Sequence, residues 1–289
     1  MKEKSAANNS DYFAQMTDHI VKPGVYIPET GIEYPDIPDT PIQNPKIKYD
    51  TDFEHNYPFL DKSLYGKWNS FIIYAGIFTL VFPLHILRYG LKITGKENIR
   101  KNRHLFKNGA MTVSNHTYAW DFLAVAQAVK FRRLWFPARA LQVKSSSKFM
   151  IRGAGGIPIP ESLSSLRHFN QAFDELHSKK KWLHVFPESC RWDFYQPIRP
   201  FRRGAFKMAY RYDIPVIPMV FSYRKPTGIY RILGIKHPLV TLHIGTPIVP
   251  SQTAGKDRNE ICDEMRRNAH SQMCSMAGIE KNMWPAEAD

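Results

Sequence analysis

The sequence feature that most constrains the fold is a run of twenty residues, 68–87, without a Lys, Arg, Asp or Glu. At a rise of about 1.5 Å per residue, a helix of this length matches the hydrocarbon thickness of a bilayer. Pro83 should kink such a helix, because proline removes a backbone donor and crowds the preceding turn. Two structures stay open: a membrane anchor, either spanning or partly sunk, and a buried core helix. The length favours the anchor.

The flanks of this run also suit a membrane interface. Aromatic residues of the kind that anchor helices at the headgroup level lie along it: Tyr65, Trp68, Tyr74 and Tyr89. Basic residues follow at once: Arg88, Lys92, Lys96, Arg100, Lys101 and Arg103. Positive residues near a membrane segment tend to stay inside the cell. We therefore expect a membrane location, with the rest of the chain on the cytoplasmic side.

The charge of the chain is divided unevenly. The formal net charge is +14, but residues 1–60 contain 5 Lys against 10 Asp and Glu, which gives −5 and leaves +19 for the rest. A basic body attracts anions such as lipid headgroups, phosphorylated small molecules, acidic carrier proteins or nucleic acid. The sequence contains no recognised nucleic-acid-binding motif, so we expect membrane lipids and not nucleic acid as partners.

Residues 1–62 form a Pro-rich, acidic N-terminal extension. Residues 1–60 hold seven of the 21 prolines, which disfavour helix, so we expect an extended segment that packs loosely on the body or is disordered. The first ten residues are polar and do not resemble a signal peptide. The three cysteines form no CxxC pair, which fits a reducing compartment. The predicted division is the extension at 1–62, an anchoring segment at 63–90 and one domain at 91–289.

From residue 91 onward, predicted strands alternate with predicted helices. The strands are expected at 110–113, 134–141, 182–186, 216–221 and 240–244, and the helices at 119–129, 162–176, 205–212 and 258–276. This alternation is typical of an α/β domain. We predict a mostly parallel sheet flanked by helices, preceded by the N-terminal membrane-anchoring helical segment.

The first candidate site is residues 114–121 (SNHTYAWD), which follow a predicted strand and open a predicted helix. If Asp121 binds one ring nitrogen of His116, the other nitrogen can take a proton from a substrate. The alternative is a histidine that only satisfies nearby backbone groups.

The second is residues 184–191 (HVFPESCR), where an apolar strand ends in proline and is followed by Glu188 and Arg191. Strand ends of α/β sheets are preferred ligand sites, and an arginine there suits bidentate binding of phosphate. The alternative is a Glu188–Arg191 surface pair.

The third candidate is residues 151–160 (IRGAGGIPIP), where glycines allow close backbone approach. No GK[ST] follows, so this is not a P-loop, and a structural turn is the alternative. Residues 214–220 (IPVIPMV) read by themselves as a core strand.

The order of these blocks is more specific than any one of them. N-H-x4-D, a glycine-rich block before a short Ile-Pro strand, F-P-E-x-x-R and I-P-V-I-P together resemble the lysophosphatidic acid and glycerol-3-phosphate acyltransferase family. Residues 91–99 (LKITGKENI) and 201–209 (FRRGAFKMA) resemble segments that flank these blocks in the family. The resemblance covers about residues 65–250 and is carried chiefly by the HX4D and F-P-E-x-x-R motifs.

The resemblance implies a membrane-bound O-acyltransferase of phospholipid biosynthesis. His116 would act as general base on an acceptor hydroxyl, with Asp121 orienting it, while that hydroxyl attacks an acyl thioester. Acyl-CoA or acyl carrier protein would be the co-substrate, with no cofactor and no metal. By the same analogy, Arg191 would bind the acceptor phosphate and Glu188 would contact the acceptor or hold Arg191. The implied substrate-binding residues are Asn115, Gly155, Gly156, Ile157, Glu188 and Arg191.

Three positions depart from the family pattern. Ser189 and Cys190 replace Gly and Thr of the usual F-P-E-G-T-R, and Glu161 stands where an arginine commonly follows the short strand. Arg152, Arg167 or Arg202 are the candidates to replace that arginine. The expected acceptor is 1-acyl-glycerol-3-phosphate. Another lysolipid, an amine-bearing lipid, or a non-catalytic lipid-binding role at the membrane surface stays open.

Overall fold

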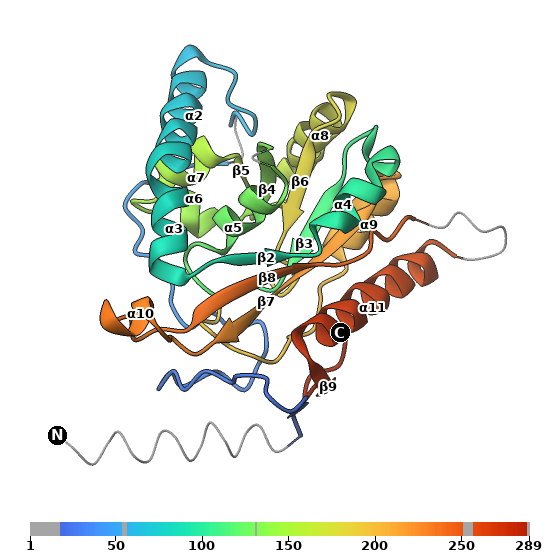
Figure 1. Ribbon diagram of the computed structural model, residues 1–289. Helices are drawn as coiled ribbons and strands as arrows, with labels where there is room; N and C mark the ends of the chain where they lie inside the picture. The colour runs from blue at the N-terminus through green and yellow to red at the C-terminus, as the bar shows by residue number, and fades with distance from the viewer. Residues whose placement is uncertain (1–17, 54–56, 131, 251–256, 288–289) are drawn as a thin grey trace.

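The computed structural model describes residues 18–53, 57–130, 132–250 and 257–287, and its centre is a seven-stranded sheet (Figure 1). The strand order is β2-β8-β7-β3-β6-β4-β5. The strands are β2 (Lys92–Thr94), β3 (Met111–Ser114), β4 (Leu134–Ala138), β5 (Gly156–Pro158), β6 (Trp182–Val185), β7 (Val216–Arg224) and β8 (Leu239–Ile244). All neighbours in this sheet pair in parallel except β7 and β8, which are antiparallel. The predicted α/β fold with a mostly parallel sheet is confirmed.

The sheet is covered on both faces, which explains why its central strands are almost continuously apolar. Along β7, Val216 and Val220 belong to one core, while Ile217 and Met219 belong to the other, as the two-residue period of a strand requires. The first core includes side chains of α8 (Leu163–Ser178), α9 (Gly204–Arg211) and α11 (Arg258–Ala277). The second includes those of α3 (Phe82–Tyr89) and α5 (Asp121–Ala128).

The predicted helices at 119–129, 162–176, 205–212 and 258–276 correspond to α5, α8, α9 and α11. The predicted strand at 134–141 ends at Ala138, because a helical turn begins at Ala140. Several short elements were not predicted: α4 (Lys96–Lys101), the 3-10 turn η2 (Arg103–Phe106), α6 (Ala140–Val143), α7 (Lys148–Ala154) and α10 (Ile229–Ile232). These elements are too short to repeat a helical hydrophobic period, which is the signal that reveals longer helices.

The uncharged run forms α2 (Leu64–Gly76), a π-helical segment η1 (Ile77–Val81) and α3. Pro83 lies in the first turn of α3. The hydrogen-bond pattern therefore changes in the residues just before proline, as expected where proline removes a backbone donor.

This helix is amphipathic in the opposite sense to a helix on the surface of a soluble protein. Its polar residues face the body: the Nδ2 of Asn69 donates to the carbonyl of Phe149 at 3.1 Å, and the Nε2 of His85 lies 2.9 Å from the hydroxyl of Tyr118. Its outer face is exposed and apolar, with Leu64, Tyr65, Trp68, Phe71, Ile72, Phe78, Leu80, Leu84, Ile86 and Leu87. The alternative of a buried core helix is therefore wrong. By length and composition, this one helix among the described residues could cross a membrane.

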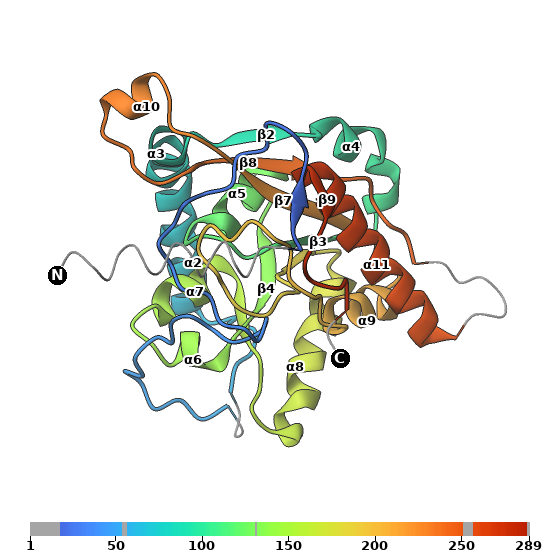
Figure 2. The same ribbon diagram turned by 90° about the horizontal axis from the view of Figure 1, so that it is seen from below.

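The described part of the N-terminal extension runs across the face of the molecule seen in Figure 2. It begins with β1 (Ile20–Val21), which pairs antiparallel with β9 (Ile279–Lys281) near the C-terminus. The described part is extended, without a helix before Leu64, and it packs on the body at a few points, because Tyr34, Phe53 and Phe59 are each only 4% exposed while most of its other residues are exposed or half-buried. Buried aromatic rings hold this segment, and residues 1–17 lie outside the described part of the chain. The division at residues 62 and 90 stays a prediction.

Candidate active site

The candidate site lies where two adjacent parallel strands, β3 and β6, reach their carboxyl ends. The loop after β3 carries His116, and the loop after β6 carries Glu188. Since β3 and β6 are hydrogen-bonded neighbours in the same direction, their ends bring the two sequence blocks together. The two motifs are 72 residues apart in sequence, and the backbone N–H of His116 donates to the Oε2 of Glu188 at 3.0 Å.

The first block forms a fixed His–Asp pair. The Nδ1 of His116 lies 2.6 Å from the Oδ2 of Asp121, a side chain that is almost fully buried. Asp121 is the first residue of α5, and it also accepts from the backbone N–H groups of Thr117 at 2.9 Å and Phe122 at 2.7 Å. These hydrogen bonds hold the Asp121 carboxylate at the N-terminal end of α5.

This geometry determines which ring nitrogen of His116 can do chemistry. An ionised Asp121 only accepts hydrogen bonds, so the Nδ1 of the neutral ring carries the proton and the Nε2 keeps its lone pair. The ring stacks on Phe186 with centroids 3.9 Å apart and planes 16° apart, and the side chain is 24% exposed. An oriented imidazole with one basic nitrogen near solvent can act as a general base.

Glu188 connects the two loops and does not bind Arg191. Its carboxylate accepts from the backbone of His116 and from Arg199, whose backbone N–H lies at 2.9 Å and whose Nη2 lies at 2.8 Å. The alternative of a Glu188–Arg191 surface pair is therefore wrong, as is the implied role of Glu188 in holding Arg191, because Arg199 donates to both carboxylate oxygens of Glu188. Arg191 instead pairs through its Nε with Asp193 at 2.8 Å, and each of these side chains is 37% exposed.

Arg199 is the residue of this region that the sequence analysis missed. Its side chain is 1% exposed and, besides Glu188, its guanidinium donates to the carbonyl of Pro38 at 2.8 Å and lies 3.0 Å from the Sγ of Cys190. It also sits over the ring of Trp192, 4.4 Å from the centroid. No spacing in the sequence relates Arg199 to Glu188, so only the fold reveals the pair.

The two changes in the third block have visible structural consequences. Ser189 has a φ of 71°, in the left-handed region where glycine is favoured, so the family's usual glycine is replaced by a residue under backbone strain. Cys190 is buried, and its Sγ lies 3.5 Å from the carbonyl of Thr40 in the N-terminal extension. Burial raises the pKa of the Cys190 thiol, partly offset by nearby Arg199, so this thiol stays protonated near neutral pH.

The candidates to replace the missing arginine differ in their surroundings. Glu161 forms a surface pair with Lys144 at 2.8 Å. Arg202 pairs with Asp39 of the N-terminal extension, and Arg167 lies exposed on α8. The Asp39 carboxylate of the extension thus already pairs with the guanidinium of Arg202.

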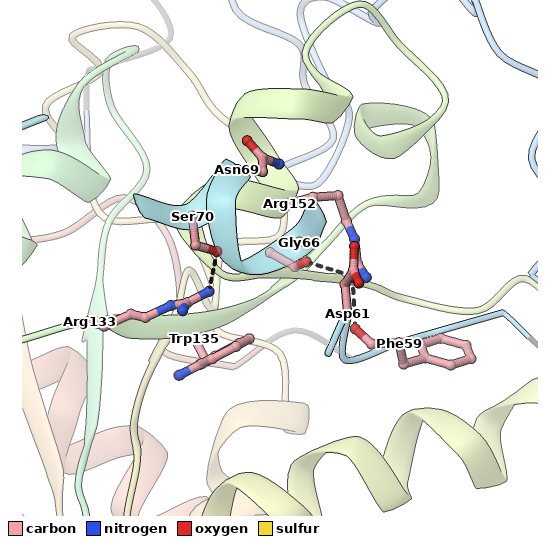
Figure 3. Close-up of a pocket in the computed structure, with 9 residues that line it drawn as sticks. Phe59, Asp61, Gly66, Asn69, Ser70, Arg133, Trp135 and Arg152 are labelled. Carbon is pink, nitrogen blue, oxygen red and sulfur yellow. Dashed lines mark hydrogen bonds between the residues drawn. The ribbon is translucent and has the colours of Figure 1, made fainter. Parts of the chain in front are cut away.

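The remaining candidate to replace the missing arginine is Arg152, which faces a small cavity beneath α2, shown in Figure 3. Its guanidinium donates to the carbonyls of Pro58 at 2.6 Å and Phe59 at 2.8 Å, so it holds the extension against the body. Across the cavity, Arg133 donates to the hydroxyl of Ser70 at 2.8 Å. The volume of about 10 Å³ suits one water molecule and is too small for a lipid headgroup.

The glycine-rich block is explained by packing. Gly155 ends α7 with a φ of 109°, and a Cβ there would lie 2.5 Å from the carbonyl oxygen of Leu134. A Cβ on Gly156 would lie 2.5 Å from a methyl carbon of Ile151, and Ile157 is fully buried in the core. The structural-turn interpretation therefore accounts for these positions.

The structure does not bring the whole set of predicted site residues together. β5, which carries Gly156 and Ile157, is separated from β3 by β6 and β4, whereas His116, Asp121 and Glu188 meet at one sheet edge. Asn115 is 1% exposed, and its Oδ1 accepts from the backbone N–H of Phe221 at 2.9 Å, so it ties the end of β3 to β7. In the described parts of the chain, His, Cys, Asp and Glu side chains do not gather in groups of three that could hold a metal ion.

Comparison with known proteins shows what this chain is similar to. The crystal structure of the 1-acyl-sn-glycerophosphate (LPA) acyltransferase PlsC from Thermotoga maritima matches 75% of this chain and 84% of that chain, with a TM-score of 0.50 and 18% identity, which shows the shared fold. The 1-acyl-sn-glycerol-3-phosphate acyltransferase of Saccharomyces cerevisiae is 23% identical over 146 residues, or 47% of this chain. The match spans only 44% of that yeast protein. Residues 90–222, which contain the His116–Asp121 pair and Glu188, match the Acyltransferase family model.

Proposed function

We propose that this chain is a membrane-bound acyltransferase that moves a fatty acyl group from an acyl thioester to the hydroxyl of a lysophospholipid. The observation that carries the proposal is the His116–Asp121 pair, in which Asp121 holds Nδ1 at 2.6 Å and leaves Nε2 for proton transfer. The relatives named above both act, by their names, on 1-acyl-glycerol-3-phosphate, which we propose as the acceptor.

The proposed reaction needs no covalent enzyme intermediate. The Nε2 of His116 takes the proton of the acceptor hydroxyl as its oxygen attacks the thioester carbonyl carbon. The C–S bond then breaks, and the departing thiolate of the donor receives the proton from the imidazolium. Asp121 stabilises the imidazolium while it exists. The nearby thiol of Cys190 supports direct transfer, because burial raises its pKa and disfavours the nucleophilic thiolate.

Arg191 is the proposed contact for the acceptor phosphate. It follows the β6 end that carries Glu188, and its guanidinium is partly exposed beside Asp193. A planar, permanently charged group can bind a phosphate through two hydrogen bonds. The two proposed donors, acyl-CoA and acylated acyl carrier protein, are both acidic. A basic domain attracts them electrostatically.

We further propose that the α2–η1–α3 helix lies in the plane of the membrane surface. Its 26 residues would be about 39 Å long. Residues of this helix that are buried against the body run from Gly66 near its start to Tyr89 at its end. A helix that packs on the domain along its whole length cannot cross a bilayer while the domain stays outside. Its exposed apolar face suits partial immersion instead.

The test is acyl transfer by the purified protein in detergent, with labelled acyl-CoA and acyl carrier protein as donors and a panel of lysolipids and amine-bearing lipids as acceptors. His116→Ala should lower turnover by about 10²–10⁴-fold, the usual contribution of positioned proton transfer, with an unchanged melting temperature. His168→Ala, which changes an exposed histidine on α8, is the matched control and should keep wild-type activity.

Retained turnover in His116→Ala would reject the role of His116. Product formed only on another lysolipid or an amine-bearing lipid would keep the reaction and replace the acceptor. If wild type forms no product on any acceptor yet binds anionic vesicles in a salt-sensitive way, the non-catalytic lipid-binding role is favoured.

A further inference from the structure

We propose that α10 and its flanking turns form a second membrane-contact element that inserts into an anionic lipid surface; this rests on the membrane association in the proposed function. α10 lies in the connection between β7 and β8, residues 225–238. Ile232 is 84% exposed, Ile229 64% and Leu233 59%. Three large apolar side chains in one short element are unfavourably exposed to water, and their transfer into a lipid interface lowers the free energy.

The charges around this apolar tip identify the partner as an anionic lipid surface. Lys225, Arg231 and Lys236 are exposed in the same connection, which contains no Asp or Glu. Basic side chains around apolar ones match a bilayer, since the former reach headgroup phosphates while the latter enter the acyl region. A second copy of this chain would instead have to supply carboxylates to match the three cations.

The element continues the apolar face of the α2–η1–α3 helix. The hydroxyl of Tyr230 donates to the carbonyl of Ile86 at 3.1 Å, so α10 rests on the end of α3. Ile86 and Leu87 are themselves 52% and 60% exposed. In both Figure 1 and Figure 2, α10 lies beside α3 on the side of the molecule that also carries α2 and α7. α7 adds exposed Phe149 and Met150 to that side.

The position of α10 relative to the helix is fixed by the fold. The guanidinium of Arg224 donates to the carbonyls of Gly90, at the end of α3, and Val240, on β8, the latter at 3.2 Å. Two contacts on one rigid body, the helix and α10 beside its end, set how the domain tilts on the membrane, which a single helix free to roll about its axis cannot do. Tyr89 then links this corner to the loop of the candidate site, because its ring packs 5.1 Å from that of Tyr118.

Vesicle flotation tests the proposal, with neutral phosphatidylcholine vesicles and vesicles that also contain phosphatidylglycerol. The double variant Ile232→Ser/Leu233→Ser should bind both kinds at least about tenfold more weakly, because each methylene withdrawn from the acyl region costs about fourfold in partitioning. Arg231→Gln/Lys236→Gln should lose about fivefold per charge, on anionic vesicles only. Leu163→Ser is the matched control: Leu163 is 87% exposed but lies on α8, and its loss should leave binding unchanged.

Acyl transfer separates this proposal from the proposed function. The Ile232→Ser/Leu233→Ser variant should keep wild-type turnover on detergent-dispersed acceptor and lose it on acceptor embedded in vesicles. Wild type without any turnover would reject the proposed function, while flotation would still report on α10. Vesicle binding of the double variant equal to that of Leu163→Ser would overturn the α10 proposal. The proposal would also be overturned if sedimentation showed wild type to be a dimer and the double variant a monomer, because α10 would then be a protein interface.

Discussion

At the scale of single residues, the buried Glu188–Arg199 pair makes the sharpest prediction. Both side chains are at most 2% exposed, so removing one leaves an uncompensated buried charge. Arg199→Met should lower the free energy of unfolding by about 3–5 kcal/mol, measured by denaturant unfolding in detergent. Arg211→Met is the matched control, since Arg211 and Asp174 form an exposed pair worth at most about 1 kcal/mol. Equal losses in the two variants would show that the Glu188–Arg199 pair is not desolvated.

At the scale of elements, neutral histidines are packed between the sheet and its helices. Burial lowers the pKa of His184, on β6, to about 3 and that of His270, on α11, to about 4. As the pH falls from about 6.5 toward 4, the unfolded chain takes up protons that these buried rings do not. The free energy of unfolding should therefore fall by up to about 1.4 kcal/mol per pH unit for each ring, and its full value is present above about pH 6.5.

His270→Gln removes one of these rings while keeping a side chain that can donate to the carbonyl of Ile198, the partner of the His270 Nε2 at 3.3 Å. Urea unfolding between pH 4.5 and 7.5 should show a shallower loss of stability for this variant than for wild type. Parallel pH curves for the two proteins would mean that His270 titrates alike in the folded and unfolded chain.

At the scale of the whole molecule, both ends of the apolar helix are tied to the domain. Before α2, Lys62 pairs with Glu175 of α8 at 2.7 Å, and after α3 the chain enters β2 of the central sheet at Lys92. Lys62→Cys and Lys92→Cys should therefore react with a membrane-impermeant thiol reagent from the same side of sealed vesicles. Leu163→Cys, on α8, marks the side of the domain. Labelling of the two helix ends from opposite sides would establish a spanning helix instead.

The sequence by itself determined the fold class, the His116–Asp121 pair and the apolar helix. Each of these features depends on residues that are close together in the sequence. Strand and helix periods repeat within each element, and His116 and Asp121 lie five residues apart across a strand–helix junction. The ordered motifs added the resemblance to an acyltransferase family, because their combination is specific even where each motif is weak.

Only the tertiary structure decided which side chains distant in sequence contact one another. Glu188 could have paired with Arg191, three residues away, but it pairs with the buried Arg199, which also donates to the carbonyl of Pro38 in the N-terminal extension. The glycines of the glycine-rich block are needed for close packing against β4, which the sequence alone does not show. The polar face of the apolar helix turns inward because the domain supplies hydrogen-bond partners there. The helix α10 lies beside α3 because β7 ends and β8 begins at that corner. Contacts between segments distant in sequence leave no periodic signal in the chain, and for that reason only the folded structure reveals them.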